Sequence, residues 1–199
     1  MNTQTPAEEL RHKAVLGAAY QAFISYGFRK TSMDEIAQRA GLSRPALYQY
    51  FRNKDDIARQ LLQAYYDTAA QAVSAALADD GPCAQVLERA LHAQGGGVIE
   101  PVFTSAHGRE LLDASTQLGA DIKQTGEARL AAIYADWLKK GDARGRIGLH
   151  GQPPDQIAAT LLGAAYGIKM SADSYASYTA RLSQLARMIG AGLAAAATP

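Results

Sequence analysis

Residues 31–54 read TSMDEIAQRAGLSRPALYQYFRNK, and their spacing predicts two short helices joined by a tight turn. A Ser–Glu capping box at Ser32 begins the first helix, and Gly41 supplies the positive φ at which that helix ends. Ser43 caps the second helix, whose first turn tolerates Pro45 because a proline there loses no intrahelical hydrogen bond. The stretch therefore has the form of a helix-turn-helix.

The second helix of this motif carries different chemistry on its two faces. Leu47 and Phe51 are four residues apart and are expected to pack inward with Ile36 and Leu42. The other side chains suit a DNA major groove, because Gln pairs with base edges and aromatic rings touch thymine methyl groups. These residues are Ser43, Arg44, Ala46, Tyr48, Gln49 and Tyr50.

Helix N-termini and hydroxyl groups beside this face are expected to bind phosphates. The candidates are Thr31, Ser32 and Lys54, and loss of a phosphate contact at Lys54 would reduce the salt dependence of binding. Several alternatives stay open at this stage. The motif could be an ordinary helical hairpin, Tyr48 and Tyr50 could pack on neighbouring helices, and Arg44 could hold a phosphate instead of a base.

The composition of the chain predicts an all-α protein. Of its 199 residues, 48% are hydrophobic, so the chain can bury a core. Good helix formers dominate, and no stretch alternates as a strand would. Further helices are expected at 6–26, 54–78, 83–94, 108–117, 119–140, 154–170 and 173–197, the last capped by Asp173, which gives about nine in all.

Charge and cysteine content narrow the class of protein. Residues 1–60 contain nine Lys or Arg against six Asp or Glu, whereas the rest of the chain is slightly acidic. Such a division suits a protein that touches phosphates with one end only. The single Cys83 excludes an internal disulfide, and no run is apolar enough for a membrane span or a signal peptide. A cytoplasmic protein without a membrane partner is expected.

The motif and its flanks closely resemble the signature of the TetR family of bacterial regulators, and the Tyr-x-Tyr-Phe-x-x-Lys ending at 48–54 is the most specific part. The resemblance is strong over residues 10–62. It implies a DNA-binding domain at 1–53, an effector-binding and dimerisation domain at 54–199, and a homodimer on a palindromic operator. It also implies that Pro45 lies with the base-facing residues, and that Thr31, Tyr50 and Lys54 hold phosphates.

The C-terminal part offers aromatic candidates for a small-molecule effector site. Aromatic walls with few charges would suit an apolar or aromatic effector, although each residue could instead belong to the core. The candidates are Phe103, His107, Tyr134, Trp137 and Tyr166. The four histidines lack metal-ligand spacing, so neither a metal site nor a cofactor is expected.

The last two predicted helices are apolar on more than one face, which favours a dimer interface over a purely internal core. Gly163 and Gly167 would permit a close helix crossing. The candidate interface residues are Ile157, Leu161, Ala164, Ile168, Leu182, Leu185 and Ile189.

The residues and the resemblance together predict a sequence-specific transcriptional repressor that a small effector releases from DNA. An activator, or a ligand-independent regulator of the same fold, is the alternative. A helical enzyme with Cys83 as nucleophile lacks a partnering base in the sequence. A helical binding protein that uses its C-terminal part alone is the third possibility.

Overall fold

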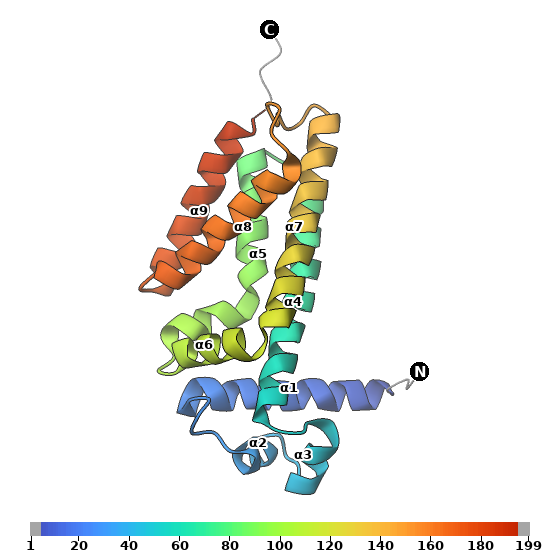
Figure 1. The fold of residues 1–199 in the computed structure, drawn as a ribbon, viewed down its shortest axis with the longest axis vertical. Helices are drawn as coiled ribbons and strands as arrows, with labels where there is room; N and C mark the ends of the chain where they lie inside the picture. Colours follow the sequence, from blue (N-terminus) through green and yellow to red (C-terminus); the bar gives the residue numbers. More distant parts are fainter. Residues whose placement is uncertain (1–4, 195–199) are drawn as a thin grey trace. The chain divides into compact units, whose positions relative to one another are not determined.

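The computed structural model describes residues 5–194, and within that range the chain forms nine α-helices and no β-strand (Figure 1). The helices divide between two compact units. Of the described residues, unit 1 contains 5–65 and 100–123, and unit 2 contains 66–99 and 124–194. The unit boundaries fall inside α4, α5 and α7, so these three helices contribute to both units. The prediction of an all-α protein is confirmed.

Helix α1 (Pro6–Tyr26) begins and ends where its local sequence signals lie. The Thr5 hydroxyl accepts a hydrogen bond from the Glu8 N–H, and the Glu8 carboxylate accepts one from the Thr5 N–H at 2.7 Å. At the other end Gly27 has φ 91°, which favours glycine, and its N–H donates to the Phe23 carbonyl. Phe28 then folds back edge-on to the Phe23 ring, with ring centroids 5.0 Å apart.

Polar side chains also cap the next three helices. Ser32 and Glu35 form the capping box of α2 (Met33–Arg39), and the Ser43 hydroxyl caps α3 (Arg44–Tyr50). The Asn53 side chain accepts a hydrogen bond from the Asp56 N–H at 2.8 Å, at the start of α4 (Lys54–Ala78). Side chains at these caps satisfy N–H groups that have no partner within the helix.

Unit 1 has one hydrophobic core, to which α1, α2, α3, α4 and α6 (Gly108–Leu118) all contribute. Phe23, Ile36 and Leu47 are fully buried in it, and Leu111 brings α6 into the same cluster. Helix α6 therefore packs on the helix-turn-helix module, although the two are far apart in sequence.

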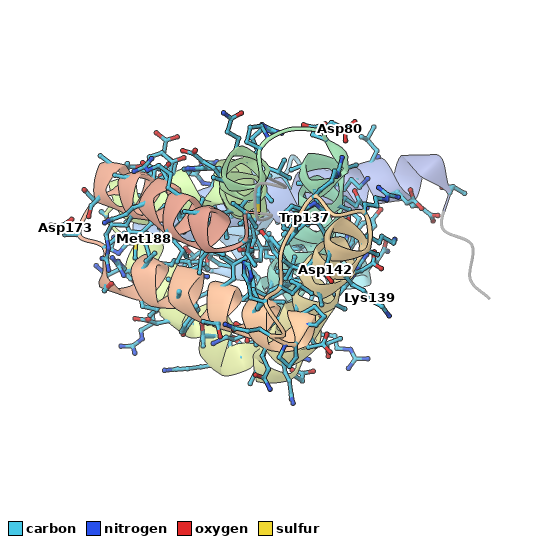
Figure 2. The ribbon with its side chains drawn as sticks, turned by 90° about the horizontal axis from the view of Figure 1, so that it is seen from above. Asp80, Trp137, Lys139, Asp142, Asp173 and Met188 are labelled. Carbon is cyan, nitrogen blue, oxygen red and sulfur yellow. The ribbon has the colours of Figure 1, made fainter. Side chains whose placement is uncertain are left out.

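Unit 2 is a bundle formed by parts of α4, α5 (Cys83–Thr104) and α7 (Ala120–Ala143), together with α8 (Pro154–Ser171) and α9 (Tyr175–Gly192). Helices α8 and α9 lie side by side (Figure 1). Figure 2 shows Asp173 in the turn that joins them. The fully buried side chains of unit 2 include Tyr134, Leu161 and Leu182.

Two helices differ from the sequence prediction. Helix α5 does not stop at its glycine run: Gly96 interrupts it with φ 53° and ψ −162°, and helical structure then continues to Thr104, because Ile99 and Val102 supply buried apolar contacts. The cap of α9 is Ser174 instead of Asp173, since the Ser174 hydroxyl accepts from the Ser177 N–H. The expected end of this helix at residue 197 lies outside the described residues. No helix of the described chain combines the length and hydrophobicity needed to cross a bilayer.

Candidate DNA-binding site

The buried side of the helix-turn-helix fixes the orientation of α3. Ile36 from α2 and Leu47 from α3 are fully buried, and Phe51 follows them into the core of unit 1. Leu42, in the turn between the helices, is partly buried against the same core. Because these side chains occupy one side of α3, the opposite side is left at the surface.

The exposed side of α3 carries most of the residues expected to face bases. Ser43, Arg44, Pro45 and Gln49 are exposed, and the Tyr48 side chain is exposed to 44%. A glutamine, an arginine and an exposed aromatic ring on a short helix provide the donors, acceptors and apolar contacts that major-groove base edges require. We call the set Ser43, Arg44, Pro45, Ala46, Tyr48 and Gln49 the α3 reading face.

Ala46 and Tyr50 lie at the margin of this face and are partly buried. Tyr50 packs against the core cluster of unit 1, with its ring centroid 6.5 Å from that of Phe51. The packing role considered for Tyr50 is therefore present, whereas Tyr48 is the aromatic side chain that α3 presents outward.

Thr31 and Lys54 bind groups inside the protein. Thr31 is only 2% exposed, and its hydroxyl donates to the Gly27 carbonyl at 2.8 Å. The Lys54 ammonium donates to the carbonyl oxygens of Phe28 and Arg29, both at 2.9 Å. Both residues thus brace the loop between α1 and α2.

Ser32 and Ser43 lie at the helix N-termini as predicted. The Ser32 hydroxyl and N–H both bind the Glu35 carboxylate, and these hydrogen bonds lower the pKa of Glu35. The Ser43 hydroxyl accepts from the Ala46 N–H at 3.3 Å and donates to no other described residue. Of the two serines, Ser43 thus keeps a hydroxyl proton for an external acceptor.

Asp34 is a residue of this surface that the sequence analysis did not identify. Its carboxylate lies 3.1 Å from the Arg44 Nη1, and the Arg44 guanidinium lies 5.7 Å from the centroid of the Tyr48 ring. Tyr48 and then Asp34 raise the pKa of Arg44. Since the ion pair joins α2 to α3 across the turn, no helical periodicity in the sequence could have revealed it.

Two polar contacts attach the α6 region to other parts of unit 1, namely the loop after α1 and the first turns of α4. The Glu110 carboxylate accepts from the Arg29 N–H at 2.9 Å and lies where a Cβ at position 27 would be, so Gly27 leaves room for it. The Arg59 guanidinium donates to the Leu118 carbonyl and to both carboxylate oxygens of Asp121, at 2.9 and 2.7 Å.

The five candidate effector residues are divided between the units. Phe103 and His107 belong to unit 1, where His107 Nδ1 lies 3.3 Å from the Glu110 carboxylate. Tyr134, Trp137 and Tyr166 belong to unit 2. Tyr134 is fully buried in the core, whereas Trp137, labelled in Figure 2, and Tyr166 are partly exposed. No group of three or more His, Cys, Asp or Glu in the described chain is arranged to hold a metal ion.

The candidate interface residues also divide into two groups. Leu161 and Leu182 are fully buried within the chain itself and so belong to its core. The other five are partly exposed: Ile157, Ala164, Ile168, Leu185 and Ile189. Beside them, Gly163 and Gly167 face open space, and Met188 of α9, labelled in Figure 2, is exposed to 66%.

These features define a helix-turn-helix protein with an all-helical body. Residues 15–61 match the sequence model described as "Bacterial regulatory proteins, tetR family". Over this N-terminal part the chain is similar to the TetR family, whose members are DNA-binding transcriptional regulators. Burial raises the pKa of the Cys83 thiol to about 11, so little of it is in the nucleophilic thiolate form near neutral pH.

One relative matches less than half of the chain. The HTH-type transcriptional activator FasR of Mycolicibacterium smegmatis is 36% identical over 88 residues, which cover 44% of this chain and 40% of FasR. The match thus spans less than half the length of that relative.

Solved structures match almost the whole fold. A transcriptional regulator of the TetR/AcrR family from Thermobifida fusca has a TM-score of 0.68 at 25% identity, covering 92% of this chain and 97% of that one. SmeT, the repressor of the Stenotrophomonas maltophilia multidrug efflux pump SmeDEF, has a TM-score of 0.67 at 19% identity, covering 92% and 90%. A SmeT–triclosan complex matches with the same TM-score and coverage at 17% identity.

Proposed function

We propose that this protein is a homodimeric transcriptional repressor that reads a palindromic operator through the α3 reading face and is released by a small effector. The observation that carries the proposal is the two-sided character of α3. Buried Leu47 and Phe51 anchor one side, while Arg44, Tyr48 and Gln49 are exposed on the other. In a helix-turn-helix protein the N-terminal residues of the second helix contact the bases.

Dimerisation is supported by the surface of α8 and α9. Gly163 and Gly167 lie one turn apart on α8, and a Cβ at either position would meet no atom within 4 Å. Small residues on a helix surface permit the backbones of two helices to approach closely. Together with the exposed Met188 they form a surface that a second copy of the chain would cover.

The proposed effector is a small, apolar or aromatic molecule. Trp137 and Tyr166 are the candidates best supported, since both are partly exposed within unit 2 and both join an apolar ring to a polar group. SmeT, which shares the fold, forms a complex with triclosan. Triclosan is accordingly the first probe: at a hundred times its Kd, a ligand adds about 2.7 kcal/mol to the free energy of unfolding.

Activation is the second candidate function, because the relative FasR is a transcriptional activator. In vitro transcription from a promoter that contains the operator separates the two. A repressor lowers transcript yield, and its effector restores the yield; an activator raises it.

The DNA-binding proposal is tested by enrichment of duplexes from a randomised pool with the full chain. We expect one two-fold symmetric sequence to be enriched. Tyr48→Ala should then weaken binding to that duplex by about fivefold or more, since a base contact contributes about 1–3 kcal/mol.

Leu10→Ala is the control, because Leu10 is a large apolar side chain exposed to 72% that lies on α1, outside the α3 reading face. The proposal fails if no sequence is enriched, or if Tyr48→Ala binds the enriched duplex as tightly as the wild type.

A further inference from the structure

Arg44 is exposed, but its guanidinium has two close neighbours, Asp34 and Tyr48. Arg44 is the first residue of α3, and Asp34 is the second residue of α2. The two side chains meet at 3.1 Å across the turn, although both are 60% exposed. An ion pair as exposed as this contributes little to folding, so its stability effect does not explain the arrangement.

The Arg44 guanidinium is restrained from two directions. The Asp34 carboxylate holds its Nη1 edge, and the Tyr48 ring lies under the group at 5.7 Å. A guanidinium has five N–H donors in a rigid fork. One bond to Asp34 leaves the pair of parallel donors that the O6 and N7 atoms of guanine require.

The charge of the pair favours a base edge over a phosphate. A lone arginine gains from phosphate by releasing counterions. When a carboxylate lies 3.1 Å away, the net charge of the pair is close to zero, and the carboxylate repels a phosphate that approaches the same cation. The acceptors of guanine carry no formal charge and meet no such repulsion.

On the basis of the proposed DNA-binding function, we infer that Asp34 is a specificity-determining residue that orients Arg44 toward a guanine without itself touching a base. Asp34 thus acts as a positioning residue. It lowers the affinity of Arg44 for phosphates in general. It also keeps the guanidinium in the geometry in which Arg44 recognises one guanine in each half-site.

The test uses the duplex that the wild type enriches, together with duplexes in which each base pair is replaced in turn. Arg44→Ala is expected to abolish the preference for guanine at one symmetry-related pair of positions. Asp34→Asn should reduce that same preference by about fivefold or more. It should also raise the affinity for unrelated DNA and make it more salt-dependent. Asp34→Ser is a second neutral variant, and a thermal melt shows that each variant is folded.

Asp55→Asn is the matched control. Asp55 is an exposed aspartate at the second position of α4, so its replacement makes the same charge change at the same helical position without touching Arg44. This variant should keep the wild-type base preferences.

Three outcomes are decisive against the inference. Asp34→Asn and Asp34→Ser could keep wild-type preferences within twofold. Arg44→Ala could weaken binding equally for every duplex and lower the salt slope by about one, which would assign Arg44 to a phosphate. If the wild type enriches no sequence at all, the proposed function itself fails and this inference fails with it.

Discussion

The ammonium group of Lys54 binds the loop that leads into the helix-turn-helix. Its nitrogen lies 2.9 Å from two backbone carbonyl oxygens, those of Phe28 and Arg29, and 5.0 Å from the centroid of the Phe28 ring. These bonds satisfy carbonyls of the loop between α1 and α2, just before α2 begins. Lys54 therefore braces the loop between α1 and α2.

Replacing Lys54 distinguishes this role from a phosphate contact. We expect Lys54→Ala to weaken operator binding while leaving the slope of log Kd against log salt unchanged, because a positioning residue releases no counterions. If Lys54 neutralised a phosphate, the slope would fall by about 0.9. Fluorescence anisotropy over a salt series measures both quantities, and Lys30→Ala, at an exposed lysine of the same loop, is the comparison.

At the scale of elements, both ends of helix α6 are attached to other parts of unit 1, the loop after α1 and the first turns of α4. Glu110 in its first turn accepts a hydrogen bond from the Arg29 N–H, and Arg59 of α4 caps its last carbonyl while pairing with Asp121. Both attachments lie within unit 1. A shift of α6 would therefore act directly on the start of α4 and on the loop before α2.

The Arg59–Asp121 pair makes a pH-dependent contribution to the stability of this attachment. Arg59 is the main cause that lowers the pKa of Asp121 from its ordinary value of 3.8 to about 2. A carboxyl group whose pKa is lower in the folded than in the unfolded protein stabilises the fold when the pH is above its unfolded-state pKa. The contribution of Asp121 is therefore present above about pH 4 and disappears as the pH falls toward 2.

NMR titration of the Asp121 carboxyl group should give a pKa near 2 in the wild type and a value returning toward 3.8 in Arg59→Gln. Denaturation midpoints at pH 7 and pH 3 should differ less in that variant than in the wild type. An unchanged Asp121 pKa in Arg59→Gln would rule out the pairing as its cause.

Local signals explain which elements could be predicted from the sequence. The caps at Thr5, Ser32, Ser43 and Asn53 act within four residues, so their patterns determine where the first four helices begin. The helical structure after Gly96 depends on burial against other helices, which the spacing of residues in the sequence does not reveal.

The candidate site follows the same division. Which side of α3 is buried could be predicted from the spacing of Leu47 and Phe51. The inward roles of Thr31 and Lys54 depend on carbonyl groups of a loop whose path the sequence does not specify, and the Asp34–Arg44 pair depends on how α2 crosses α3.

For the whole molecule, the proposal requires two copies of the module. Two recognition helices must be presented about 34–36 Å apart, one turn of DNA, or at a multiple of that spacing. A single chain carries one α3 reading face, so the proposed recognition of a palindrome would depend on the dimer surface that we propose on α8 and α9.

A bulky residue on that surface tests dimerisation. Gly163→Leu is expected to shift the protein toward the monomer in sedimentation equilibrium and to weaken operator binding, because the side chain would hold the partner helix away. Gly17→Leu is the matched control, since Gly17 is also an open glycine of a helix, but on α1. The dimer surface is elsewhere if both variants remain dimeric.

The central claim is that the α3 reading face contacts bases in the major groove, and a scan of base analogues in the operator tests it most directly. We predict that replacing guanine or adenine by its 7-deaza analogue, or thymine by uracil, weakens binding at symmetry-related positions of both half-sites. Those changes alter only major-groove atoms. The Tyr48→Ala protein should lose its sensitivity to the thymine substitutions. Wild-type binding that is indifferent to every major-groove analogue would contradict the account.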